Sequence, residues 1–162
     1  MVKRIDSKDT AFIQWKNRVG SESGHRFVFT NGCFDVLHPG HIKLLQYAKS
    51  LGSYLIVGLN SDESVKKLKG EKRPIHKLSD RILILSELQS VDFVIPFEEN
   101  TPLMLIQLLR PNVLVKGGDY RLEEIVGAAI IRGWGGIVRI YPIEAGHSTT
   151  SILHKLDSDN LG

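Results

Sequence analysis

The chain has 162 residues, 42% apolar and 24% charged, and 21 basic against 18 acidic residues give a formal net charge of +3. This length predicts one domain, and this composition, which is close to the globular average, excludes long disordered segments. The mild positive charge does not favour nucleic-acid binding, the apolar runs are too short to span a membrane, and the single cysteine, Cys33, excludes an internal disulfide and a cysteine-rich zinc site.

The chain alternates between two hydrophobic periods after an N-terminal helix and linker at 1–24. Within residues 25–162, short apolar runs typical of strands buried on both faces of a parallel sheet lie at 26–31, 53–60, 91–96, 112–116 and 137–141. Segments with helical spacing lie at 41–51, 79–90, 101–110, 121–132 and 148–156. Ser79 and Thr101 are expected to be N-caps, the latter followed by Pro102 in the first helical position.

Strands that alternate with helices predict an α/β fold, here a single domain with a five-stranded parallel sheet flanked by helices. In such a sheet, ligands bind beyond the carboxyl ends of the strands, at the point where the strand order reverses. The segments that follow the first, fourth and fifth predicted strands are therefore the candidate functional segments.

Two histidines follow the first strand, in the segment TNGCFDVLHPGH at 30–41, which leads directly into a helix. His38 and His41 are three residues apart, so both can direct N–H donors at one anion, supported by the unpaired amides of the helix start. Zinc binding is the alternative, with Asp35 or His147 as a further ligand.

A basic cluster follows the second strand, with five cations within eight residues: Lys66, Lys67, Lys69, Lys72 and Arg73. It is either a solvated loop and helix end or a loop that closes over an anionic ligand.

The segments after the fourth and fifth strands are also polar. Lys116-Gly117-Gly118-Asp119 lets the backbone approach a ligand closely, and Asp119 can accept hydrogen bonds from a ribose or an amine, although the same residues suit an ordinary turn. Ser148–Ser151 begin a helix with four hydroxyl residues, which suits either simple capping or a phosphate site.

Three common motifs are missing from the sequence: the P-loop, the G-x-G-x-x-G fingerprint and the G-x-S-x-G elbow. The remaining pattern, rich in cationic and neutral donors, suits nucleotidyl transfer to a phosphate. A phosphate nucleophile is already ionised at about pH 7. The enzyme then has to position the reactants and to neutralise charge on the α-phosphate and the pyrophosphate.

The segments HPGH, TNGCFD and STTS together resemble the HxGH nucleotidyltransferase superfamily. Within it, LKGEKRP at 68–74 and VKGGDY at 115–120 are similar to the bacterial D-glycero-β-D-manno-heptose 1-phosphate adenylyltransferases. The resemblance implies a Rossmann-like nucleotidyltransferase fold and transfer of AMP from ATP to heptose 1-phosphate. The products would be pyrophosphate and ADP-heptose for lipopolysaccharide core or surface glycans. Mg²⁺ would be held mainly by the phosphates, with no protein side chain as a metal ligand.

The resemblance also implies roles for individual residues. The catalytic residues would be His38, His41 and Lys69. The acceptor would be bound by Asp35 and Arg73. The nucleotide would be bound by Cys33, Phe34, Gly40, Lys116, Gly118, Asp119, Ser148, Thr149, Thr150 and Ser151.

The sequence departs from the superfamily pattern near its C-terminal end. Ala145 stands where an acidic residue is usual, which leaves Glu144 and His147 without an assigned role. Ile143 stands where glycerol-phosphate cytidylyltransferases carry an arginine, which argues against that branch.

Two alternatives stay open: a cytidylyltransferase acting on glycerol 3-phosphate or another polyol phosphate, and a nucleotide-binding regulatory module without turnover. We expect a cytoplasmic protein, since no secretory signal pattern opens the chain, and the family resemblance implies a homodimer. We also expect a separate heptose kinase upstream, and neither nucleic acid nor membrane as a partner.

Overall fold

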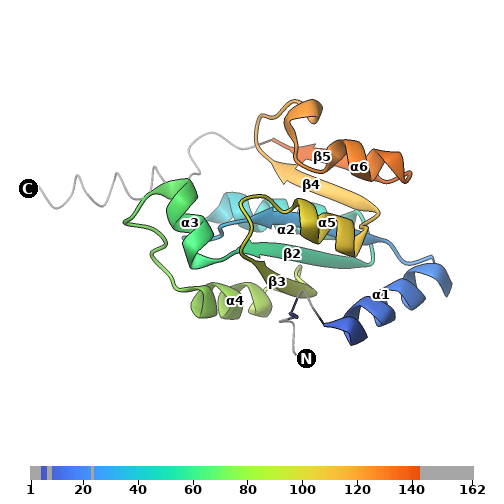
Figure 1. Ribbon diagram of the computed structural model, residues 1–162, viewed down its shortest axis with the longest axis horizontal. Helices are drawn as coiled ribbons and strands as arrows, with labels where there is room; N and C mark the ends of the chain where they lie inside the picture. The colour runs from blue at the N-terminus through green and yellow to red at the C-terminus, as the bar shows by residue number, and fades with distance from the viewer. Residues whose placement is uncertain (1–4, 7–8, 23, 143–162) are drawn as a thin grey trace, which may run out of the picture.

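A five-stranded parallel sheet forms the centre of the computed structural model, which describes residues 5–6, 9–22 and 24–142 (Figure 1). Its strands run in the order β3-β2-β1-β4-β5, so the strand order reverses at β1. The strands are β1 (Phe27–Gly32), β2 (Tyr54–Asn60), β3 (Phe93–Phe97), β4 (Val113–Gly117) and β5 (Ile137–Tyr141). Each overlaps an expected strand, and every pair is parallel, which confirms the predicted fold class.

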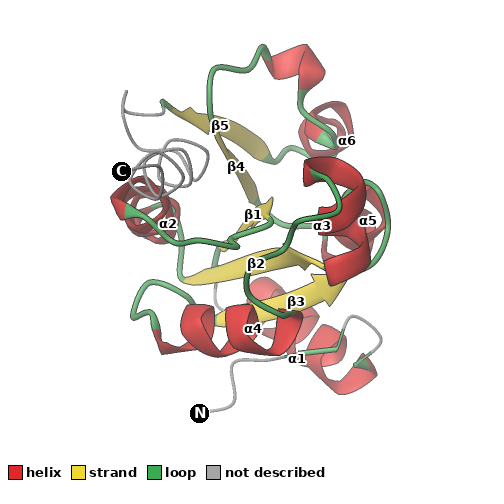
Figure 2. Cartoon of the chain, turned by 90° about the vertical axis from the view of Figure 1, so that its left-hand side faces the viewer, coloured by secondary structure: helices red, strands yellow, loops and turns green. Residues whose placement is uncertain are grey.

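Helices cover both faces of the sheet (Figure 2). One face carries α1 (Thr10–Glu22), α5 (Leu103–Leu109) and α6 (Ala128–Gly133), whose apolar side chains pack with Phe27 and Phe29 of β1. The other face carries α2 (Pro39–Ser50) and α4 (Leu78–Glu87), which pack against Val28. Successive residues of β1 thus enter opposite cores, as expected for a strand buried on both sides.

The N-terminal helix lies against the sheet through aromatic contacts. Phe12 is buried, and the ring of Trp15 lies within 6.0 Å of those of Phe27, Tyr54 and Phe93, measured between centroids. None of the helices in the described part of the chain is both long and apolar enough to cross a lipid bilayer.

Two expected N-caps are wrong. Lys77 rather than Ser79 precedes α4, because its carbonyl accepts the first hydrogen bonds of that helix, from Asp80 and Arg81. Pro102 rather than Thr101 precedes α5, because the Pro102 carbonyl accepts from Ile106 N–H at 2.9 Å.

The helix expected at 121–132 is divided. A 3₁₀ turn (Leu122–Glu124) and α6 are separated at Gly127, which has φ +87°. A Cβ at Gly127 would lie 2.7 Å from Ile106 Cδ1, so both the conformation and the space require glycine.

One short helix was not expected from the sequence. α3 (Asp62–Lys69) begins after Ser61, whose side chain accepts a hydrogen bond from Ser64 N–H, and it carries Lys66, Lys67 and Lys69 of the basic cluster. The helix expected at 148–156 lies outside the described residues.

Candidate active site

A cavity of about 570 Å³ opens at the carboxyl edge of the sheet, beside the strand where the order reverses. Its walls come from segments after β1, β2, β3 and β4 and from the end of β5. The expected site residues that line it are Cys33, Phe34, Asp35, His38, Gly40, His41, Lys69, Arg73 and Lys116. The fold therefore brings together in one cavity side chains that lie far apart in the sequence.

The β1–α2 loop lies beside this cavity and has an unusual backbone. Phe34 adopts a left-handed conformation with φ 43°, which is uncommon for a residue other than glycine. Its ring packs against Gly32, where an added Cβ would lie 3.1 Å from Phe34 Cε2. The carbonyl of Cys33 accepts a hydrogen bond of 2.8 Å from Arg81 Nη1. These contacts fix the loop that leads to the histidines.

The two histidines lie at the start of α2 with their rings stacked. His38 is the N-cap, with φ −142° and ψ 167°, and its carbonyl accepts from His41 N–H at 2.9 Å. The ring centroids are 3.8 Å apart. Burial, together with the neighbouring His38, lowers the pKa of His41 from 6.5 to about 4, so its imidazole is neutral at neutral pH.

His41 also has an unsatisfied atom. Its Nδ1 is buried and has no hydrogen-bond partner among the described residues. A polar atom buried in this way loses its interactions with water unless a ligand replaces them. Because His41 also lines the cavity, its ring is placed to donate an N–H hydrogen bond to an anion there.

Asp35 is buried at the cavity wall and its carboxylate contacts the chain itself. Arg73 Nε donates to Oδ2 at 2.6 Å, and the backbone N–H groups of Ile75 and His76 donate at 2.8 Å each. Burial alone would raise the pKa of this carboxyl, but these hydrogen bonds outweigh it and hold the pKa below 3.8. The residues expected to bind the acceptor are thus paired with each other in this structure.

The zinc alternative lacks a ligand set in the described part of the chain, which contains no group of three or more His, Cys, Asp or Glu side chains placed to hold a metal ion. The Asp35 carboxylate, considered as a third ligand, already accepts the hydrogen bonds of the 73–76 segment. His147, the other candidate, lies outside the described residues.

A fully buried arginine supports this arrangement. Arg81 donates to the carbonyls of Cys33, Asn60 and His76 and forms an ion pair of 2.7 Å with Asp62. It joins the segments after β1 and β2 to the segment before α4. Arg81 was not among the expected site residues, although it precedes Leu85 by four residues and therefore lies on the buried face of the expected helix.

Two lysines bring positive charge to the cavity. Lys69 ends α3 and Lys116 lies on β4. Burial lowers the pKa of Lys116, the Cys33 thiol opposes this effect, and the nearby Lys69 adds to it. Burial likewise raises the pKa of the Cys33 thiol. The cavity thus holds cations at some electrostatic cost, which an anionic ligand would offset.

Some expected site residues lie elsewhere. Gly118 and Asp119 form the turn after β4 and do not line the cavity, and Asp119 is exposed. Ser148, Thr149, Thr150 and Ser151 lie outside the described residues, as do Ile143, Glu144 and Ala145. Lining residues that the sequence analysis missed include Asn60, Asn100, Thr101, Tyr120, Glu124 and Tyr141.

Comparison with known proteins identifies a matching family and several proteins with similar sequences. The model of the cytidylyltransferase-like family matches residues 29–154. Over 133 residues the chain is 53% identical to the bifunctional protein HldE of Geobacter sulfurreducens, covering 82% of this chain and 27% of that protein. Over 137 residues it is 51% identical to HldE of Actinobacillus pleuropneumoniae serotype 5b, covering 85% of this chain and 29% of that protein. The chain spans less than a third of the length of these curated relatives.

Solved structures give the same fold. A lipopolysaccharide core biosynthesis protein from Thermoplasma volcanium superposes with a TM-score of 0.59 at 31% identity, covering 75% of this chain and 98% of that one. The pantoate-beta-alanine ligase of Francisella tularensis, complexed with β-γ ATP and β-alanine, also has a TM-score of 0.59, at 16% identity over 89% of this chain and 68% of that one. The second likeness concerns the fold alone.

Proposed function

Since the chain belongs to the cytidylyltransferase-like family and is a nucleotidyltransferase, we propose that it transfers AMP from ATP to D-glycero-β-D-manno-heptose 1-phosphate. The observation that carries the proposal is the stacked pair of His38 and His41 at the start of α2, in one cavity with Lys69 and Lys116. The choice of acceptor is supported by the LKGEKRP and VKGGDY segments and by the likeness to a lipopolysaccharide core biosynthesis protein.

In the proposed reaction, an oxygen of the sugar phosphate attacks the α-phosphorus of ATP. The bond between the α-phosphorus and the bridging oxygen breaks, and pyrophosphate leaves with the electron pair. Because the attacking phosphate is already ionised, no general base is needed. N–H donors of the histidine pair, of which His41 is neutral, and the two lysine cations stabilise the charge that develops on the phosphates. Mg²⁺, if bound with ATP and held mainly by its phosphates, would supply further positive charge there, and no protein side chain is expected as its ligand.

Pyrophosphate release by the purified chain tests this function. Heptose 1-phosphate is supplied with ATP or with CTP in the presence of Mg²⁺. Release with ATP alone supports the proposal. Release with CTP alone keeps the reaction class and overturns the choice of base. No release with either nucleotide overturns the proposed acceptor, and a panel of other phosphate monoesters, glycerol 3-phosphate included, then identifies the acceptor class.

We further propose that the chain acts as a homodimer in the cytoplasm on a sugar phosphate supplied by a kinase activity outside these 162 residues. The relatives are named bifunctional, and this chain matches less than a third of each. Light scattering of the eluted protein at several concentrations measures the oligomeric state, and a monomer at all of them would overturn the dimer.

A further inference from the structure

The two sides of the cavity differ in chemistry. On the side of β4 and β5, the lining includes a group of aromatic and aliphatic side chains, Tyr120, Ile125, Val126 and Tyr141, next to the charged residues Lys116 and Glu124. On the side of β2 and β3, the lining side chains are mostly neutral polar groups and cations: Asn60, Asn100, Thr101, Lys69 and Arg73. The histidine pair follows β1, between these two sides.

This division matches the two substrates of the proposed reaction. A nucleobase is flat and stacks on apolar and aromatic side chains. A sugar phosphate carries several hydroxyl groups, each of which donates and accepts hydrogen bonds, and one anionic group. Amide and hydroxyl side chains also donate and accept. The β2–β3 side therefore suits the sugar phosphate, and the β4–β5 side suits the nucleoside.

The loop between β3 and α5, residues 98–102, supplies two of these polar groups, Asn100 and Thr101. Both residues are exposed, and their side chains form no hydrogen bond with any other residue that the structure describes. Their amide and hydroxyl groups are therefore available to a ligand in the cavity.

A buried polar chain fixes this loop against α3. Asn60 Nδ2 donates to Ser64 Oγ at 2.9 Å, and Ser64 Oγ donates to the Glu99 carbonyl at 3.5 Å. Asn60 is 4% exposed and Ser64 1%, so water does not replace these bonds. Next to them, Ser61 N–H donates to the Phe97 carbonyl at 2.9 Å. These bonds tie Phe97 and Glu99, which precede Asn100 and Thr101, to the start of α3.

We propose that Asn100 and Thr101 bind the hydroxyl groups of the acceptor sugar, and that Ser64 is a positioning residue for their loop. The proposal rests on the proposed function and names the residues that select the acceptor. Lys69, at the end of α3, lines the same cavity and is the cation proposed to meet the phosphate of the sugar, whereas Arg73, which also lines it, is paired with Asp35.

Initial-rate kinetics with each substrate varied in turn test this assignment. Asn100→Ala and Thr101→Val each remove one hydrogen-bonding group, so each is expected to raise KM for heptose 1-phosphate about 3- to 10-fold, while KM for ATP changes less than about twofold. Ser64→Ala is expected to raise KM for heptose 1-phosphate without changing KM for ATP. Glu98→Gln is the matched control, since Glu98 is exposed on the same loop but does not line the cavity, and both KM values should stay unchanged.

A second substrate separates sugar recognition from general damage. Mannose 1-phosphate lacks the seventh carbon and its hydroxyl but keeps the anionic group. If the loop selects the sugar, the preference for heptose 1-phosphate over mannose 1-phosphate, measured as a ratio of kcat/KM, decreases in the Asn100 or Thr101 variant. Circular dichroism confirms that each variant is folded before it is assayed.

The possible outcomes distinguish the two proposals. An active wild-type chain whose Asn100 and Thr101 variants keep both the KM for the sugar phosphate and the preference overturns the loop assignment and leaves the proposed function intact. Equal increases in KM for ATP and for the sugar phosphate also overturn it. A wild-type chain inactive with every sugar 1-phosphate overturns the proposed function and, with it, this inference.

Discussion

Asp35 and Arg73 form a buried ion pair at the wall of the cavity, with 2.6 Å between Oδ2 and Nε and side-chain exposures of 1% and 13%. The pair joins the β1–α2 loop to the end of the basic cluster, 38 residues later in the sequence. The same carboxylate accepts hydrogen bonds from the N–H groups of Ile75 and His76, so it holds the segment 73–76, which begins at the last residue of the cluster. Lys69, the last residue of α3, is therefore followed after a short turn by a second fixed point, this ion pair.

Asp35→Asn is expected to destabilise the protein by about 3 kcal/mol, because the Arg73 charge stays largely buried without its partner. Urea unfolding measures the loss. Glu71→Gln is the control, since Glu71 is exposed in the nearby turn, and it should change the free energy of unfolding by less than about 0.5 kcal/mol. Equal stability of the two variants would contradict a structural role for Asp35.

The effect of Asp35→Asn should also depend on pH. The folded-state pKa of Asp35 lies below 3.8, so its ionisation stabilises the fold above that pH, and this contribution is lost as the pH falls through the lower folded value. The stability difference between wild type and Asp35→Asn is therefore expected to be constant near neutral pH and to shrink below about pH 3.8. A difference that grows in acid would contradict this assignment of the pKa shift.

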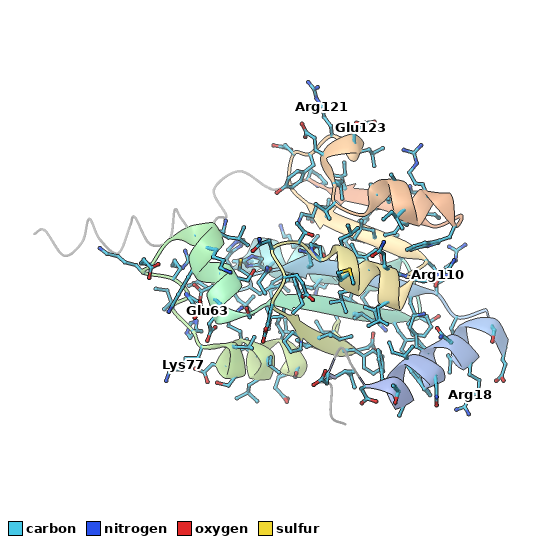
Figure 3. All side chains as sticks on the ribbon, viewed as in Figure 1. Arg18, Glu63, Lys77, Arg110, Arg121 and Glu123 are labelled. Atoms are coloured by element: carbon cyan, nitrogen blue, oxygen red, sulfur yellow. The ribbon has the colours of Figure 1, made fainter. Side chains whose placement is uncertain are left out.

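Arg81→Met is expected to destabilise the protein by about 3–5 kcal/mol, because three backbone carbonyls and Asp62 lose their donor. Arg81→Lys should not restore stability, since one ammonium cannot match the fork of a guanidinium. Urea unfolding compares both variants with Arg18→Met, which alters an exposed residue on α1 (Figure 3). Destabilisation no greater than that of Arg18→Met would contradict the role of Arg81.

The strands and the histidine pair were predictable because their determinants are local. Each strand is a short apolar run with residues buried on both sides, and the HPGH segment places its histidines at a helix start that needs no distant contact. The parallel sheet then implies which strand ends meet. For this reason Cys33 and Lys116, which are far apart in the sequence, were expected in one site, and both line the cavity.

What the sequence did not reveal depends on distant contacts. Asp35 was expected to face the acceptor, but its partners are Arg73 and the backbone about 40 residues later. The helix expected at 121–132 is divided at Gly127, whose positive φ and close approach to Ile106 on α5 the periodicity did not reveal. Asn100 and Thr101 lie in a loop whose position is fixed by a serine on a helix that the hydrophobic period did not predict.

Lys116→Met is expected to make the protein more stable at neutral pH and less active. Burial lowers the pKa of Lys116, so the folded state binds this proton more weakly than the unfolded state, and the charge opposes folding below the normal lysine pKa of 10.5. The same charge is expected to bind ATP phosphates, so KM for ATP should rise. Thermal unfolding and kinetics measure the two effects, with Lys72→Met, an exposed lysine outside the cavity, as the control. Lower stability together with unchanged KM would contradict both assignments.

The His41 imidazole is expected to titrate near pH 4 in the ligand-free chain. NMR of labelled histidines measures this directly. ATP should raise the pKa, because the negative charge of the phosphates favours the cationic ring. His38→Ala should raise it as well, but only in part, since burial is the larger cause of the shift. A His41 pKa near 6.5 without ligand would contradict the buried position of the ring.

His41→Ala is expected to fold normally and to lower kcat by a factor of about 10²–10³, the usual effect of removing one fixed donor from a developing negative charge. Folding should survive because His41 Nδ1 makes no hydrogen bond within the described chain, so its removal leaves no partner unsatisfied. His25→Ala is the control. His25 lies before β1, at the opposite edge of the sheet from the cavity, and its ring forms a hydrogen bond of 3.0 Å with Ser53 Oγ. Its loss should therefore leave kcat unchanged. Retention of near-wild-type turnover by the His41 variant would remove the histidine pair from the mechanism, whereas an equal loss in both variants would point to damage of the fold.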